Sequence, residues 1–308
     1  MGTLAWFSML NRPLDLDNLH RLLLRHRVTR EELEQKVTKL DEVERHGDLV
    51  SLKGASVREP DEEMLRWYRY KWWRVRLAVG LLRHVPFVRL VAVANTLADQ
   101  TTGKNSDIDL FIVIEDGRMY LTRTIITFLL QVTGLRRTNK KIANRFCLSF
   151  FVTTESLDLQ PVAFAPYDLY LAYWITELVP ALDGAQTFER LRAANRWVEH
   201  FVPRYHETKF PPRGPSWVSK LAERLLRGRL TDKVEERLMR WQHARIRAKA
   251  PKEEPLPPEP DERADVRVIA TDRMLKFHEK ERRRVYRARW ESEMRRRGYD
   301  PELILSTE

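Results

Sequence analysis

Residues 88–114, VRLVAVANTLADQTTGKNSDIDLFIVI, contain two apolar runs separated by a polar segment that includes a glycine. The first run, Val88 to Ala94, has the length and composition of a buried strand, and so has the second, Leu110 to Ile114. Side chains alternate faces along a strand, so Asp107 and Asp109 at the start of the second run should point the same way. The stretch therefore predicts two buried strands, with a pair of acidic residues at the start of the second.

Two carboxylates this close repel each other unless a cation lies between them. A set of oxygen ligands favours Mg²⁺ or Mn²⁺. The simpler alternative is a solvated strand start with two acids on an exposed face. The strand is too apolar for a surface strand, however, and α/β sheets place ligand sites at such strand ends. We therefore take Asp107 and Asp109 as candidate metal ligands.

The layout resembles the DNA polymerase beta-type nucleotidyltransferase superfamily, whose signature is Gly-Ser, about ten residues and then Asp-x-Asp. Asn95-Thr96 stands in the Gly-Ser place, residues 97–106 follow, and Ser106 to Leu110 has the commonest form of the acidic half, Ser-Asp-Ile-Asp-Leu. The resemblance covers roughly residues 86–155, about a quarter of the chain. It implies a metal-dependent transfer of a nucleoside monophosphate from an NTP to an acceptor hydroxyl.

The resemblance also implies roles for individual residues. Asp107 and Asp109 would be catalytic and would hold Mg²⁺ or Mn²⁺, with the NTP as substrate. The nucleotide would be bound by Asn95, Thr96, Ser106 and Arg123. Asn95 replaces the glycine whose backbone lets phosphates approach closely, and Asn tolerates a left-handed backbone better than most residues.

A third acid is usual on a later strand of this superfamily. The matching run here, Phe146 to Val152, has Cys147 and Ser149 on its polar face, and neither is a carboxylate. The nearest acids, Glu155 and Asp158, lie beyond the strand. The alternative function is therefore a catalytically degenerate module that binds nucleotide or nucleic acid without turnover.

The composition indicates which classes of binding partner to expect. The chain has 308 residues, a net charge of +11 and a pI of about 9.8, which favours polyanionic partners such as RNA or DNA bound through basic helices. A basic surface without a partner is the alternative. The single cysteine excludes an internal disulfide and a cysteine-rich zinc site. No apolar run approaches the roughly 18 residues of a membrane span, and the first residues do not form a signal peptide. We therefore expect a cytoplasmic protein without a membrane partner; the oligomeric state is not indicated.

The first 58 residues predict a small helical domain that ends in a hairpin. An apolar helix spans 4–10, a second begins near Asp15 or Asp17, and a capping box of Thr29 and Glu32 opens a third that extends to about Arg45. A hairpin over 48–53 follows. This order resembles a winged-helix domain, which binds DNA or mediates protein contacts.

Residues 60–84 predict one long helix. Its apolar stripe comprises Leu65, Tyr68, Trp72, Val75, Val79 and Leu82, and arginines cover the remaining surface. Aromatic rings interleaved with arginine could stack on bases and hold phosphates. We favour the structural alternative, in which the rings pack between two domains and the arginine stems extend outward.

Residues 118–135 predict a buried helix, and a basic loop over 136–141 follows. From Tyr167 onward the pattern is helical, with one long basic helix over 216–249 that would help to hold nucleotide or acceptor, as the resemblance implies. The last elements that the sequence predicts are a short strand over 266–270 and a solvated, highly charged helix over 272–297.

We therefore predict an α+β, mostly helical protein with a small mixed sheet. The expected parts are a winged-helix-like domain (1–58), a connecting helix (59–85), a nucleotidyltransferase-like α/β domain (86–160), a helical domain (161–249), a Pro-rich linker (250–263) and a basic terminal helix (264–308).

Overall fold

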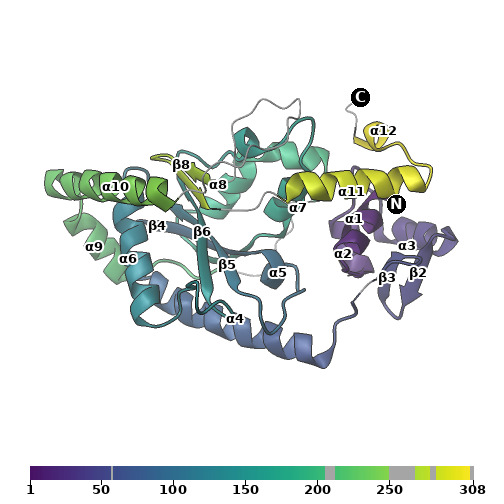
Figure 1. The fold of residues 1–308 in the computed structure, drawn as a ribbon, viewed down its shortest axis with the longest axis horizontal. Helices are drawn as coiled ribbons and strands as arrows, with labels where there is room; N and C mark the ends of the chain where they lie inside the picture. The colour runs from purple at the N-terminus through teal and green to yellow at the C-terminus, as the bar shows by residue number, and fades with distance from the viewer. Residues whose placement is uncertain (57, 205–211, 250–267, 278–281, 306–308) are drawn as a thin grey trace.

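A six-stranded mixed sheet forms the centre of the molecule (Figure 1). The computed structural model describes residues 1–56, 58–204, 212–249, 268–277 and 282–305. The strand order is β7-β4-β5-β6-β9-β8, and only β5 and β6 are parallel neighbours. The strands are β4 (Val88–Ala94), β5 (Ile108–Ile114), β6 (Phe146–Thr153), β7 (Val179–Asp183), β8 (Val268–Ala270) and β9 (Met274–Phe277). The predicted strands at 88–94 and 110–114 are confirmed as adjacent central strands.

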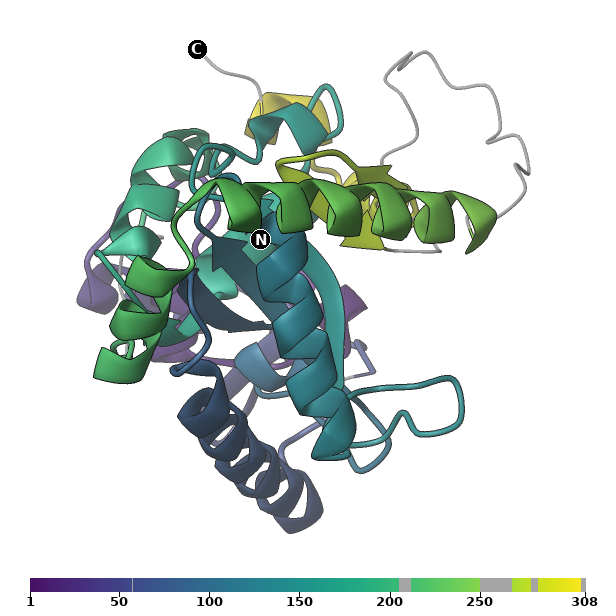
Figure 2. The ribbon, with the colours of Figure 1, turned by 90° about the vertical axis from the view of Figure 1, so that its left-hand side faces the viewer.

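Helices cover both faces of this sheet, which explains why its central strands are apolar throughout. On one face Leu110, Ile112 and Ile114 join a core with α4 (Glu62–Leu82) and α6 (Met119–Val132). On the other face Phe111 packs against Trp174 of α7 (Leu169–Glu177), with 5.5 Å between ring centroids. Figure 2 shows α6 lying along the sheet, with α10 (Arg229–Lys249) crossing its end. Alternation along β5 therefore directs Asp109 to the same face as Phe111.

The amino-terminal part has the predicted number of helices, and its strands form a separate antiparallel sheet in the order β1-β3-β2. The elements are α1 (Gly2–Met9), β1 (Leu14–Asp15), α2 (Leu16–Arg21), α3 (Arg30–Lys39), β2 (Val43–His46) and β3 (Leu49–Leu52). The capping box of Thr29 and Glu32 is present at the start of α3. The prediction that this helix extends to Arg45 is wrong, because the backbone becomes extended at Leu40 and Val43 then pairs with Leu52.

Helix α4 buries the predicted residues Val75, Val79 and Leu82, but Leu65 is exposed. Figure 1 shows why: α4 runs past the edge of the sheet, so its first turns have no sheet to pack on. Tyr70 and Trp73 are also exposed, so the expectation that the rings of this helix pack between two domains is wrong for these two.

The prediction that the chain is helical from Tyr167 onward is wrong at β7. This strand pairs with β4 at the edge of the sheet, where Pro180 can be accommodated although it lacks an N–H group. The helix predicted over 216–249 is divided into α9 (Trp217–Leu225) and α10. The break falls at Gly228, a residue that weakens a helix interior. The remaining helices of this part are α8 (Thr187–Ala194) and the 3₁₀ turns η1 (Gln160–Val162) and η2 (Arg196–His200).

The prediction of a solvated helix over 272–297 is also wrong. Residues 274–277 form β9, which pairs with β6, and α11 (Arg283–Arg296) begins only afterwards. Trp290 and Met294 of α11 are fully buried, and the Trp290 indole N–H donates to the Gly2 carbonyl at 2.9 Å. A short helix, α12 (Pro301–Leu305), follows. The terminal segment therefore packs on α1 and α7, and the linker predicted over 250–263 lies outside the described residues.

The α+β class is confirmed, with helix the dominant element and two sheets. The central sheet is larger than the 86–160 segment that we expected to contain it, because β7, β8 and β9 come from later segments. None of the described helices combines the length and apolar composition that a bilayer crossing requires.

Candidate functional site

The two predicted acids lie together at the start of β5. Ligand atoms of Asp107, Asp109 and Cys147 all lie within 4.8 Å of one another. Cys147 joins them because β5 and β6 are parallel and their register places Cys147 beside Asp109. The strand beside the pair therefore contributes a thiol, not a third carboxylate, to this cluster.

Each acid already has a polar partner. Arg137 donates from Nη1 to Asp107 Oδ2 at 2.6 Å, and Asn95 donates from Nδ2 to Asp109 Oδ2 at 2.9 Å. Burial, together with the charge of Asp107, raises the pKa of Asp109 to about 6, against the opposing hydrogen bond from Asn95. Burial and the charge of Asp109 raise the pKa of the Cys147 thiol to about 12. The thiol is therefore protonated at neutral pH.

This donor set fits one Mg²⁺ ion that shares its ligands with a substrate. Mg²⁺ is commonly held by one or two carboxylates together with substrate phosphates and water. A protonated thiol is a poor ligand for so hard a cation. Glu155 and Asp158 do not complete the site, because they follow the opposite end of β6, roughly 20 Å from Cys147 at about 3.3 Å per residue. The residues present do not supply a three-carboxylate site.

The turn after β4 has the conformation that the superfamily glycine would permit. Asn95 has a φ of +54°, in the left-handed region that Asn tolerates better than most residues. The four-residue helix α5 (Asn95–Ala98) begins there, and Thr96 lines the same cleft as the two acids. The side-chain amide of Asn95 also binds Asp109, which the glycine could not do.

Ser106 is held by Lys71, a residue that the sequence analysis missed. Lys71 is fully buried, and its ammonium donates to Thr102 Oγ1 at 2.8 Å, to the Gly103 carbonyl at 2.7 Å and to both oxygens of Ser106. Burial lowers the pKa of Lys71 to about 8, although the charges of Asp107 and Asp109 oppose this. Ser106 therefore shapes the loop before β5, so its predicted phosphate contact would have to replace these bonds. The sequence pattern could have indicated that Lys71 is buried, because Lys71 lies one turn before Val75 on the buried face of α4.

The acids open into a cleft of about 770 Å³. Six basic side chains line it against two acids: Arg123, Arg136, Arg137, Lys276, Arg282 and Arg283. Its aromatic wall comprises Phe150, Tyr170, Trp174, Phe277 and Tyr286. Arg283 is paired with the buried Asp168 at 2.7 Å, but the lining still carries more basic than acidic side chains. This positive charge suits a polyanionic ligand, and the volume suits a nucleotide.

Arg123 lines this cleft, as predicted, but it is largely held by the protein. Its guanidinium lies over Phe151 and Phe277, 5.5 and 5.1 Å from the ring centroids, and donates to Gln242. Burial, with a contribution from Arg136, lowers the pKa of Arg123 to about 10. Its Nε atom is buried without a hydrogen-bond partner in the described part of the chain.

Of the other segments that were expected near the nucleotide, one lines the cleft and one does not. Arg136 and Arg137 of the basic loop line the cleft. Helices α9 and α10 contribute no lining residue to the described cleft, although Gln242 of α10 accepts from Arg123, so the expectation that residues 216–249 help to hold nucleotide or acceptor stays a prediction. The sequence analysis missed the contribution of α11, through Arg283 and Tyr286, because this helix follows the core motif by more than 150 residues.

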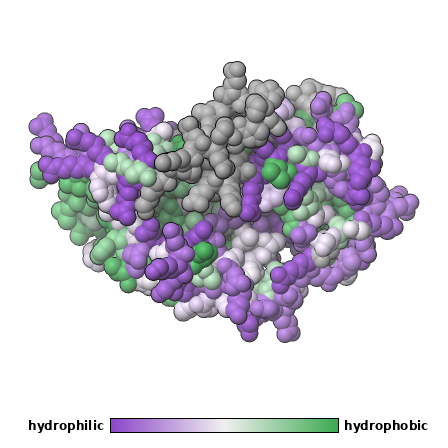
Figure 3. Space-filling model, viewed as in Figure 1, coloured by the Kyte–Doolittle hydropathy of each residue, from purple (hydrophilic) through white to green (hydrophobic). Residues whose placement is uncertain are grey.

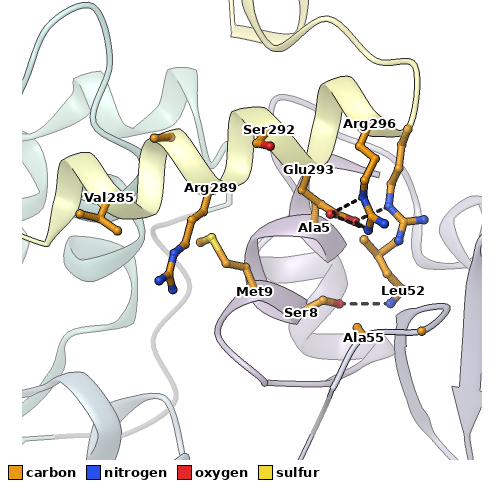
Figure 4. Close-up of a pocket in the computed structure, with 13 residues that line it drawn as sticks. Ala5, Ser8, Met9, Leu52, Ala55, Val285, Arg289, Ser292, Glu293 and Arg296 are labelled. Carbon is orange, nitrogen blue, oxygen red and sulfur yellow. Dashed lines mark hydrogen bonds and ion pairs between the residues drawn. The ribbon is translucent and has the colours of Figure 1, made fainter.

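A second cavity, of about 630 Å³, lies between α1, β3 and α11 (Figure 4). Its lining includes Met9 and Val285, and Glu293 forms ion pairs with Arg296 and Arg297. The described lining holds only one acid, Glu293, and it is ion-paired, so the cleft beside Asp107 is the stronger candidate site.

Comparison with models of known protein families, with curated proteins and with solved structures found no match.

Proposed function

We propose that the chain binds a nucleoside triphosphate together with one Mg²⁺ ion in the cleft beside Asp107 and Asp109. The observation that carries the proposal is the pairing of two convergent carboxylates with a cleft in which six basic side chains outnumber them. An ion bound by the two acids would neutralise phosphate charge. The surrounding arginines would bind the remaining phosphate oxygens.

The individual side chains divide this task. Asp107 and Asp109 would hold the cation, and Asn95 would keep Asp109 oriented through its amide. Arg137 pairs with Asp107 at present, and it could turn to the phosphates once a cation neutralises that carboxylate. Tyr170 and Trp174 form an apolar wall on which a nucleobase could pack.

Binding without turnover is the form of this function that we favour. Transfer to an acceptor hydroxyl needs a group that can take the hydroxyl proton, and the protonated thiol of Cys147 cannot do so. No third carboxylate joins the two acids among the described residues. The cleft would then serve to sense or present a nucleotide in the cytoplasm, with RNA or DNA as a further partner of the basic surface.

Nucleotidyl transfer is the second candidate. It is favoured by the retained pair of acids on one strand and by a cleft of about 770 Å³, which has room for more than a phosphate group. An acceptor that brings its own base to take the hydroxyl proton would not need the missing carboxylate.

The test combines binding with a transfer assay. Calorimetric titration with each NTP, with and without Mg²⁺, should show Mg²⁺-dependent binding that Asp109→Asn abolishes. The exposed acid Asp48, in the turn between β2 and β3, provides the matched control Asp48→Asn, which should bind normally.

Incubation with α-³²P-labelled NTP, total RNA and cell extract then separates the two candidates. Binding without labelled product supports the binding module, whereas label transfer that Asp109→Asn abolishes establishes the transferase. Failure to bind any NTP would reject both.

A further inference from the structure

Helix α9 presents its apolar side to solvent. Trp217, Leu221 and Leu225 are spaced four residues apart and therefore share one face. Trp217 is 74% exposed and Leu225 is 77% exposed. Figure 3 shows a hydrophobic patch at the end of the molecule where Figure 1 places α9. An amphipathic helix of a globular protein normally turns this face inward.

The polar side of α9 is the side that binds the protein. The Ser219 hydroxyl donates to the Val85 carbonyl at 3.0 Å, and Glu223 accepts from the Phe87 amide at 2.7 Å. Arg89 donates to the same carboxylate at 2.8 Å. These buried and half-buried bonds fix the rotation of the helix, so the outward direction of its apolar face is built into the fold.

Helix α10 continues the apolar surface. Leu230, 80% exposed, begins a stripe that includes Val234 and Trp241 on the same outward face. The neighbouring face packs on α6, where the Gln242 amide donates to the Tyr120 carbonyl at 3.0 Å and Leu238 is partly buried against the core. Figure 1 shows α9 and α10 together at one end of the molecule, with α10 extending beyond the sheet. The exposed apolar surface therefore extends over both helices.

The charges around this surface are predominantly positive. Residues 217–249 contain ten basic and four acidic side chains. Three of the acids bind inward: Glu223 to Arg89, Asp232 to Arg118, and Glu235 to the Tyr120 amide. Exposed basic residues flank the apolar positions at Lys220, Arg224, Lys233 and Arg237.

We infer that the exposed face of α9 and α10 docks on an anionic lipid surface. Helices that lie in a membrane interface combine exposed Trp and Leu with flanking Lys and Arg, as this face does. A second copy of the chain would bring two basic faces together, which costs electrostatic energy. A nucleic acid would gain little from the aliphatic side chains Leu221, Leu225 and Leu230.

This mode of contact is compatible with the lack of a spanning helix, because the helices would lie on the surface and cross nothing. The sequence expectation of no membrane partner depended on the length of apolar runs. Exposure of the apolar face depends instead on how α9 is rotated, which the pattern alone does not determine.

The test is co-sedimentation of the full chain with vesicles of phosphatidylcholine alone and of phosphatidylcholine with about one third phosphatidylglycerol. We expect binding to the anionic vesicles that weakens at high salt. Leu225→Ser should weaken it about tenfold, because transfer of one leucine side chain contributes about this factor. Leu303→Ser provides the control, since Leu303 is 76% exposed on α12, at the opposite end of the molecule.

A double change, Lys220→Gln with Arg224→Gln, should reduce binding to anionic vesicles specifically. Equal binding to both vesicle types, or binding to neither, overturns the proposal. So does a dimer in light scattering that Leu225→Ser dissociates, because a second copy would then cover the face. NTP binding by Leu225→Ser should be unchanged, so this proposal and the proposed function can fail separately.

Discussion

Replacing Cys147 with aspartate would give the cleft the third carboxylate that it lacks. The ligand atoms lie within 4.8 Å of one another, and two unit charges at that limiting separation repel by about 3.5 kcal/mol at an effective dielectric constant of about 20. Arg137 contacts both Asp107, at 2.6 Å, and Cys147, at 3.5 Å, but its single charge is already paired with Asp107, so the repulsion from Asp109 remains. We therefore expect Cys147→Asp to lower the free energy of unfolding by about 3 kcal/mol when no divalent cation is present. Cys147→Asn, of nearly the same shape but neutral, should show little of this loss.

Mg²⁺ should reverse the loss in the aspartate variant. A cation that binds only the folded state stabilises it by about 2.7 kcal/mol at a concentration 100 times its dissociation constant. Urea denaturation of the wild type and of both variants, with and without Mg²⁺, measures the effect. The gain should be largest for Cys147→Asp, smaller for the wild type and similar to the wild type for Cys147→Asn.

Two results would contradict this prediction. Equal stability of the aspartate and asparagine variants would show that the side chain at position 147 does not face the two acids. A stability difference that Mg²⁺ leaves unchanged would show that the three groups do not form a cation site. Label transfer from NTP that appears only in Cys147→Asp would identify the third carboxylate as the group whose absence prevents turnover.

Three further predictions concern stability and are measured by urea denaturation. Lys71→Met should lower the free energy of unfolding by about 3 kcal/mol, because the oxygens around the ammonium lose their donor. The control is Arg76→Met at an exposed position of the same helix, which should change the free energy of unfolding by less than about 0.5 kcal/mol. Burial favours a raised pKa for Glu223, but the hydrogen bonds from Arg89 and a backbone amide outweigh it and hold the pKa below its usual value. The stabilising contribution of the Glu223 carboxylate to the free energy of unfolding should therefore be complete above about pH 4.3 and be lost as the pH falls through the lower folded-state pKa. Glu223→Gln should remove this part of the loss of stability at acid pH. An unchanged loss of stability at acid pH in the variant would contradict the prediction. Asn195→Ala should cost about 3 kcal/mol, because the buried amide bonds three backbone groups, and a loss below about 1 kcal/mol would show that water replaces it.

The parts of the fold that the sequence predicted are those with strong local signals. β4 and β5 are continuous apolar runs between turns. The capping box that marks the start of α3 needs only Thr29 and Glu32, three residues apart. The convergence of Asp107 and Asp109 follows from strand alternation alone. The role of Cys147 was also accessible, because one parallel pairing is enough to bring it to the acids.

The parts that the sequence did not predict depend on distant segments. β7 and β9 are short and lie beside strands from other parts of the chain, so pairing determines their conformation more than local propensity does. An amphipathic pattern groups Trp217 with Leu225 but does not say which face of α9 meets the protein. Lys71 shares its helix face with apolar residues, and only the loop at Thr102 explains why a cation is buried there.

The hydrogen bond between Trp290 and Gly2 joins residues 288 positions apart in the chain. During synthesis, which proceeds from the amino end at about 5–20 residues per second, α1 therefore leaves the ribosome well before its packing partner on α11 exists. Trp6 and Phe7, fully buried in the finished protein, gain the cover of α7 only after β4, β5 and β6 have been made. Such distant contacts slow folding and leave apolar surface open while they are incomplete. The nascent amino-terminal segment therefore exposes apolar surface until α11 is in place.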